Sequence, residues 1–311
     1  MKTIFGNEIP AEWKFIARPE GIGKVMFGFS SLREGKKVYT QTERLAIRAG
    51  AAMIGAVGGT VAAFYTGSGT GATVAWVLVP ALIFLGIAAG MTPSRFYNVF
   101  LGTEGFAEYE VKADGLEPVP KGKIKFTADG HLIRKLVDHY KNGVYQYTAY
   151  TYRWVAGNGS QLYRASHQYN KKTKHERVDR SKSYLGAVQY YYLNTAEQLW
   201  TAYLKEDADK KLQVNRNATF DFPIFSSDNR QEGKITLGQH MLTLEQNGQT
   251  LTFRDSELKQ ARFEKGTLYI TDKEYRWKLF GRQGNNIAIP VERIANCLFF
   301  LMIEKELLKI S

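Results

Sequence analysis

The sequence has few of the residues that enzymes use for catalysis and metal binding. Its 311 residues include one cysteine, Cys297, and five histidines. Cys297 lies in an apolar run and has no second cysteine for an intramolecular disulfide, which fits a reducing compartment. No histidine has the cysteine or carboxylate spacing of a metal site, and no serine lies in a GxSxG motif. We therefore expect no enzyme activity, no cofactor and no bound metal.

Charge is nearly absent from two long apolar runs, residues 45–65 and 72–91. At about 1.5 Å per residue, a helix of about 20 residues spans the roughly 30 Å hydrocarbon core of a bilayer. The one charged residue, Arg48, is close enough to the start of the first run to reach the membrane interface. A buried hairpin of a soluble protein is the alternative, but both runs exceed the length of ordinary core helices. Residues 45–91 are predicted to form a transmembrane helical hairpin.

A secretory signal peptide is also missing, because residues 1–44 contain eight Lys and Arg and no sufficiently long apolar core. These cations lie before or near the first span, Arg95 follows the second, and the connecting turn is uncharged. The positive-inside rule therefore predicts a multi-pass inner-membrane protein with both termini in the cytosol. Residues 1–44 are predicted to be a cytosolic N-terminal segment. The helix interiors lack the carboxylates, lysines and histidines of an ion or proton pathway.

Small residues form rows on both predicted spans. Ala51, Gly55 and Gly59 recur every four residues on the first span, and Gly86 and Gly90 form a similar row on the second. Such rows let helix backbones approach closely in a membrane. They are therefore the candidate helix-packing residues, either within the hairpin or in a homo-oligomer.

After Pro93 the pattern changes to strands, and it repeats. Asn142-Gly143 lies between two strand-forming runs, which is a strong hairpin signal because a type I′ turn needs two residues at positive φ. A second turn at Gly266 has similar flanks, and each copy leads to an amphipathic helix, near 185–204 and 290–308. The fold class is therefore α+β, with domains at 95–211 and 219–311. Each domain is expected to be a small barrel or sandwich closed by its C-terminal helix.

The net charge of +12 is concentrated in one region, because residues 121–182 alone carry +10. The stretch from Trp154 to the first closing helix is longer than the stretch from Trp277 to the second, which indicates a basic insertion at 161–182. A basic region beside a membrane anchor is typical of contact with an anionic surface. The candidate anionic-surface residues are Arg164, Lys171, Lys172, Lys174, Arg177, Arg180 and Lys182.

The chain resembles pleckstrin-homology-like (PH-like) domains and, more closely, an uncharacterised bacterial family in which two such units occur together. The segments that carry the resemblance are FLGTEGF at 100–106, YKNGVY at 140–145 and IPVERIANCLFFL at 289–301. The resemblance implies a bent, seven-stranded sheet capped by a helix in each unit. PH-like members bind phosphoinositides, peptides or other proteins, so the fold implies no single ligand.

These features lead to two functional hypotheses. In the first, the protein is a non-enzymatic, membrane-anchored scaffold whose PH-like domains bind anionic lipid headgroups or a protein partner. In the second, it is an obligate subunit of a larger membrane complex or a homo-oligomer, held by the small-residue rows. Tyrosine-rich segments beside basic residues are also compatible with nucleic acid. A membrane anchor and the need for aromatic core packing disfavour that partner.

Overall fold

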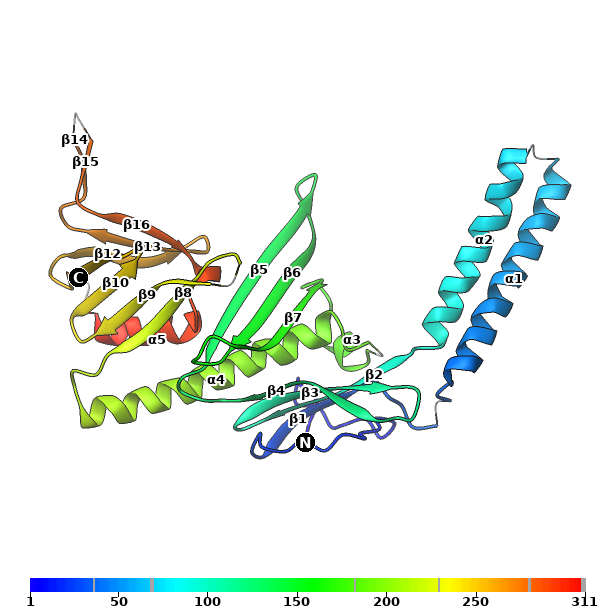
Figure 1. Cartoon of the computed structure of the whole chain (residues 1–311), viewed down its shortest axis with the longest axis horizontal. Helices are drawn as coiled ribbons and strands as arrows, with labels where there is room; N and C mark the ends of the chain where they lie inside the picture. Colours follow the sequence, from blue (N-terminus) through cyan, green and yellow to red (C-terminus); the bar gives the residue numbers. More distant parts are fainter. Residues whose placement is uncertain (36, 68–69, 182, 229, 279–280, 309–311) are drawn as a thin grey trace.

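The computed structural model of the protein describes residues 1–35, 37–67, 70–181, 183–228, 230–278 and 281–308. The fold is α+β, with an apolar helical pair and several antiparallel sheets. The helical pair projects from one end of the molecule, and the C-terminal sheets lie at the other end (Figure 1). A long helix, α4 (Ala187–Val214), starts beside the sheets of the first half of the chain and reaches toward the C-terminal sheets.

The apolar pair consists of α1 (Gln41–Thr66) and α2 (Thr70–Met91), which confirms the two predicted helices. Helix α1 begins at a capping box, in which Thr40 and Glu43 each bind the other's backbone N–H. It ends at Gly67, whose φ of 59° is the left-handed conformation that glycine adopts without strain. Local sequence therefore determines both ends of α1.

The first sheet includes a strand from each side of this hairpin. Its order is β1-β2-β3-β4, and its strands are β1 (Val25–Ser30), β2 (Arg95–Gly102), β3 (Gly105–Lys112) and β4 (Pro118–Lys125). Strand β1 pairs antiparallel with β2, with Phe29 opposite Val99. Residues 1–44 are therefore not a separate segment, and the α1–α2 hairpin is inserted between two neighbouring strands of this sheet.

A three-stranded sheet follows, with the order β5-β6-β7. It contains β5 (His131–Lys141), β6 (Val144–Val155) and β7 (Gln161–Tyr169). Residues 161–169, predicted to begin a basic insertion, are thus the third strand of the sheet and pair with β6. The remaining connection to α4 contains one short helix, α3 (His175–Asp179).

The C-terminal part repeats this plan. A four-stranded sheet of order β11-β10-β9-β8 is followed by a three-stranded sheet of order β12-β13-β16. The strands are β8 (Phe220–Phe225), β9 (Gln231–Gly238), β10 (Met241–Gln246), β11 (Gln249–Arg254), β12 (Leu258–Glu264), β13 (Thr267–Asp272) and β16 (Asn286–Pro290). A small ribbon, β14 (Arg276–Lys278) and β15 (Gly281–Gln283), lies between β13 and β16. A 3₁₀ turn, η1 (Val291–Arg293), and α5 (Cys297–Leu307) complete it.

The predicted closed barrel is not formed. Among the described residues, the four-stranded and three-stranded sheets of each unit are separate and open. The predicted closing helices are present at α4 and α5, although α4 extends ten residues beyond the predicted end at 204. Helix α5 begins at Cys297 rather than at the predicted residue 290, which ends strand β16. Packing against these helices buries the inner faces of the sheets, so closure by hydrogen bonds is not required to form a core.

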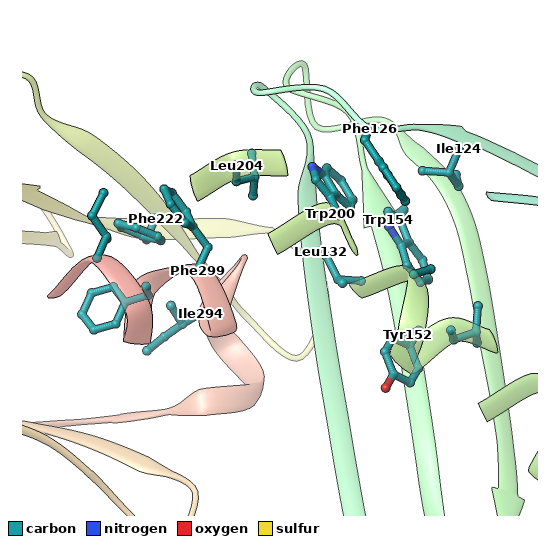
Figure 2. Close-up of a cluster of buried hydrophobic side chains, with 14 of the residues drawn as sticks. Ile124, Phe126, Leu132, Tyr152, Trp154, Trp200, Leu204, Phe222, Ile294 and Phe299 are labelled. Atoms are coloured by element: carbon teal, nitrogen blue, oxygen red, sulfur yellow. The ribbon is translucent and has the colours of Figure 1, made fainter. Parts of the chain in front are cut away.

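One aromatic core extends from the first unit to the second (Figure 2). Trp154 of β6 stacks with Trp200 of α4, with ring centroids 6.5 Å apart and an interplanar angle of 8°. Leu204, one turn further along α4, belongs to the same cluster as Phe222 and Phe299 of the second unit. Burial of these large side chains by a shared helix couples the two units.

Polar contacts also hold the foot of the hairpin against the first sheet. Arg44 is 6% exposed and forms an ion pair with Asp114, with Nη2 and Oδ2 2.9 Å apart. Nη2 of Arg48 donates to the backbone oxygen of Thr92 over 3.0 Å. These contacts connect the start of α1 to the β3–β4 connection and to the end of α2.

Candidate functional site

The small-residue rows of the two helices have different surroundings. Gly55 and Gly59 are buried, and a Cβ added at Gly59 would lie 1.9 Å from the backbone oxygen of Trp76 in α2. A Cβ at Gly86 or Gly90 would meet no atom of the described residues within 4 Å. The α1 row, with half-buried Ala51 at its start, therefore packs within the hairpin, and the α2 row lies on an open face.

The predicted basic residues are divided between two places. Lys171, Lys172, Lys174, Arg177 and Arg180 are all exposed in the connection between β7 and α4. Arg164 lies on β7 itself, opposite Arg153 of β6. Lys182 lies outside the described residues. We name residues 170–181 the basic loop.

Buried and stacked residues hold the basic loop in place. Val178 of α3 is 2% exposed, and the ring of His175 stacks on Phe5 with centroids 4.1 Å apart. Within the described residues, the side chains of Lys172, Lys174 and Arg177 form no ion pair. The loop therefore presents cations that are not neutralised by carboxylates that the structure describes.

The free end of the β5–β6 hairpin lies beside this loop. Strand β7 begins to pair with β6 at Thr148, so residues 139–147, here called the ribbon tip, extend beyond the three-stranded sheet. Tyr140 and Val144 at this tip are 60% and 58% exposed. The Nζ atoms of Lys171 and Lys172 lie 4.8 and 5.8 Å from the centroid of the Tyr145 ring. The ribbon tip and the basic loop thus form one surface of exposed aromatic, apolar and cationic groups.

An ion pair joins this surface to the body of the β5–β6 hairpin. Nζ of Lys171 lies 2.7 Å from Oδ2 of Asp138. The other carboxylate oxygen of Asp138, Oδ1, accepts a hydrogen bond from the hydroxyl of Thr148. These hydrogen bonds from Lys171 and Thr148 hold the pKa of Asp138 below its usual value. Lys171 therefore fixes the basic loop to the ribbon, whereas Lys172, Lys174 and Arg177 have no carboxylate partner among the side chains that the structure describes.

A cavity of about 480 Å³ opens at the foot of the helical hairpin. Arg48, Arg95 and Tyr97 line it together with Ser183 and Tyr184, which follow the basic loop. Arginine side chains near the ends of apolar helices are suited to contact with phosphate groups at a membrane interface. The cavity, the basic loop and the hairpin foot therefore share one region of the first unit.

Comparison with models of known protein families found no match, and comparison with curated proteins found no significant similarity.

Sequence reasoning identifies the cations of the basic loop but misses their aromatic neighbours. The sequence pattern predicts that Tyr140 and Val144 are ordinary strand residues. Alternation along β5 and β6 does not reveal where the pairing with the third strand, β7, ends. The residues nearest the Asn142-Gly143 turn are the ones most readily left uncovered. That position is a usable signal for an exposed tip.

A buried carboxylate, Glu108 of β3, lies in the core beside Tyr184, which follows the basic loop. It is 4% exposed and accepts hydrogen bonds from the hydroxyls of Tyr163 and Tyr184, the latter over 2.8 Å. Gln189 of α4 approaches the same oxygen at 3.4 Å. Burial raises the pKa of Glu108 above the ordinary 4.5, because the hydrogen bonds only partly compensate for lost hydration.

The raised pKa of Glu108 predicts a pH-dependent stability. Between the ordinary value and the raised value, the folded protein holds a proton that the unfolded chain has released. The contribution of Glu108 is therefore complete below pH 4.5 and decreases as the pH rises through the folded pKa. We expect Glu108→Gln to remove this dependence from the free energy of unfolding.

The measurement is denaturant unfolding of the full chain in detergent between pH 5 and pH 8. The stability of the wild type should decline relative to Glu108→Gln as the pH rises. Glu104→Gln, which removes an exposed carboxylate from the β2–β3 turn, controls for the change in net charge. Parallel pH profiles for the wild type and Glu108→Gln would contradict the assignment.

Proposed function

We propose that this protein is a non-enzymatic, membrane-anchored scaffold. In this proposal α1 and α2 cross the inner membrane, and two PH-like units on its cytosolic side bind anionic lipid headgroups or a protein partner. The observation that carries the proposal is the exposure of the helical pair. Both helices are long and apolar enough to span a bilayer, and only 11% and 6% of their most apolar windows are buried. Core helices of soluble proteins are mostly covered, so a lipid environment accounts better for these surfaces.

The strand plan supports two PH-like units. Each unit has a four-stranded sheet, then a three-stranded sheet, then a closing helix, and the Asn142-Gly143 and Lys265-Gly266 turns occupy matching positions between the first two strands of the three-stranded sheets. Seven strands and a terminal helix are the elements that the resemblance implies. The hairpin insertion between β1 and β2 would place the first unit directly against the bilayer.

Contact with lipid is supported by the position of the cationic surface. The β5–β6 hairpin projects from the sheets toward the same side as α1 and α2 (Figure 1). A surface held near an anionic leaflet gains about 1 kcal/mol for each Lys or Arg close to it, and tethering by the helices raises the local concentration. Exposed Tyr140 and Val144 can enter the headgroup region, where amphipathic rings are favourable.

The test uses the full chain, because β1 belongs to the first sheet and a fragment starting at residue 95 would lack it. The chain is reconstituted in nanodiscs of zwitterionic lipid, with or without anionic lipid, and amide hydrogen exchange is measured. We expect exchange in the basic loop and ribbon tip to slow at least threefold when anionic lipid is present. High salt should reverse this protection.

Charge reversal separates electrostatic contact from other causes of protection. The triple variant Lys172→Glu, Lys174→Glu, Arg177→Glu should lose the protection, corresponding to about 3 kcal/mol of lost attraction. The control reverses two exposed lysines of the second unit, Lys259 and Lys273, and should keep it. Protection that is independent of anionic lipid, or unchanged in the triple variant, would exclude lipid binding by this surface.

The open row on α2 favours a second candidate function, a subunit of a larger complex or a homo-oligomer. Gly86 and Gly90 leave space for the backbone of another apolar helix. Close packing on this row would bury a helix face that the described chain leaves uncovered. A monomeric mass in mild detergent, with no co-purifying protein, would contradict this alternative.

A further inference from the structure

A second, smaller cavity of about 220 Å³ lies where the two units meet. One wall is the outer face of the β5–β6–β7 sheet, opposite the face that α4 covers. The other wall comes from the end of β8 and from η1 of the second unit. Its polar lining consists mainly of Lys135, Arg153, Arg164, Ser227, Glu292 and Arg293.

Two of the four cations in this cavity have carboxylate partners. Nζ of Lys135 lies 2.7 Å from Oε1 of Glu292, and Arg293 is paired with Glu232. Arg153 and Arg164 form no ion pair among the described residues, and they face each other across β6 and β7. The cavity therefore has an excess of positive charge from two arginines on one sheet face.

Arg153 is unusual because it is buried without an anionic partner among the residues that the structure describes. Its side chain is 5% exposed, and its guanidinium carbon lies 5.1 Å from the centroid of the Phe225 ring. Phe225 also packs with Ile133, Val155 and Ala295 in a small apolar cluster beside the cavity. Burial, together with the charge of Arg164, lowers the pKa of Arg153. A largely buried cation without an anionic partner loses hydration, and an anion bound in the cavity would compensate for that loss.

We propose that this cavity is a binding site for a phosphate-bearing anion. Guanidinium groups bind phosphate oxygens through paired N–H donors, and two arginines on one wall can contact different oxygens of the same group. The cavity is smaller than typical sites for drug-sized ligands, so it fits one or two phosphate groups rather than a large ligand. The site is separate from the basic loop.

Occupancy of this site would also affect the junction between the units. Arg153 and Arg164 belong to the first unit, whereas Phe225 and Arg293 belong to the second. A bound phosphate contacts both walls and stabilises the arrangement in which they face each other. The phosphate belongs either to a soluble molecule or to a lipid headgroup, because both present the same chemistry.

The site can be tested by calorimetric titration of inorganic pyrophosphate into the full chain in zwitterionic nanodiscs. We expect binding by the wild type and at least a tenfold loss of affinity in both Arg153→Gln and Arg164→Gln. Arg164 is exposed, so its variant tests the site even if Arg153→Gln fails to fold. Arg254→Gln removes an exposed arginine from β11 and should bind like the wild type.

The outcomes decide both the site and the source of the phosphate. Absence of wild-type binding, or equal affinity in the wild type, Arg153→Gln and Arg164→Gln, would overturn the proposal. Arginine-dependent binding that weakens in nanodiscs with anionic lipid supports a headgroup as the natural occupant. Arginine-dependent binding that is unchanged there supports a soluble phosphate compound.

Discussion

Replacement of Asn296 by alanine is expected to destabilise the protein by about 2–4 kcal/mol. Asn296 precedes α5, and its side chain spans the junction between the units. Its Oδ1 accepts from the N–H of Leu132 over 2.8 Å, and its Nδ2 donates to the oxygen of Gly130 over 2.9 Å. Alanine leaves both backbone groups without these partners, and each buried unsatisfied group costs about 1–3 kcal/mol.

Backbone conformation adds to this effect. Asn296 has a φ of 52°, in the left-handed region that asparagine tolerates better than alanine. Asn296→Gly is the matched control, because it relieves this strain but also lacks the side-chain bonds. The difference between the two variants measures strain, and the loss common to both measures the junction bonds.

Denaturant unfolding of the full chain, followed by fluorescence and circular dichroism, provides the measurement. We also expect the unfolding transition to broaden or divide in Asn296→Ala, because weaker coupling lets the two units unfold separately. A change below about 0.5 kcal/mol in both variants would show that the side chain does not stabilise the junction, since surface substitutions usually have effects of this size.

Replacement of Gly59 by alanine is expected to destabilise the α1–α2 hairpin by about 3 kcal/mol, the upper part of the usual range for overpacking. The added Cβ would lie 1.9 Å from the oxygen of Trp76 and 2.8 Å from Cα of Val77. These are backbone atoms of α2, so relief requires the helices to move apart and lose dispersion contacts along their length.

The neighbouring glycine supplies a matched control. A Cβ at Gly58 meets no described atom within 4 Å, so Gly58→Ala has the same change in helix propensity without the clash. Stability is measured by unfolding in mixed micelles of mild detergent and dodecyl sulfate, with cysteine cross-linking between α1 and α2 as a second readout. Equal stability and cross-linking in the two variants would show that the α1 row does not pack against α2.

Local pattern alone determined several elements of this protein. The two apolar runs predicted α1 and α2 to within four residues at each end, because length and uninterrupted apolar character are properties of the segment itself. Asn142-Gly143 predicted the β5–β6 turn, and both residues have positive φ, 52° and 75°. The helices that close each unit followed from the same kind of local periodicity.

Tertiary structure alone decided how distant segments combine. Strand β1 joins β2 across the whole helical hairpin, and β7 joins a sheet although the sequence placed it in an insertion. Arg153 and Arg164 meet Arg293 only because η1 of the second unit packs beside the β5–β6–β7 sheet. Strand pairing and the contact between the units depend on packing between residues that are distant from each other in the sequence. The spacing of residues within one segment does not determine such packing, so the junction cavity could be found only in the folded structure.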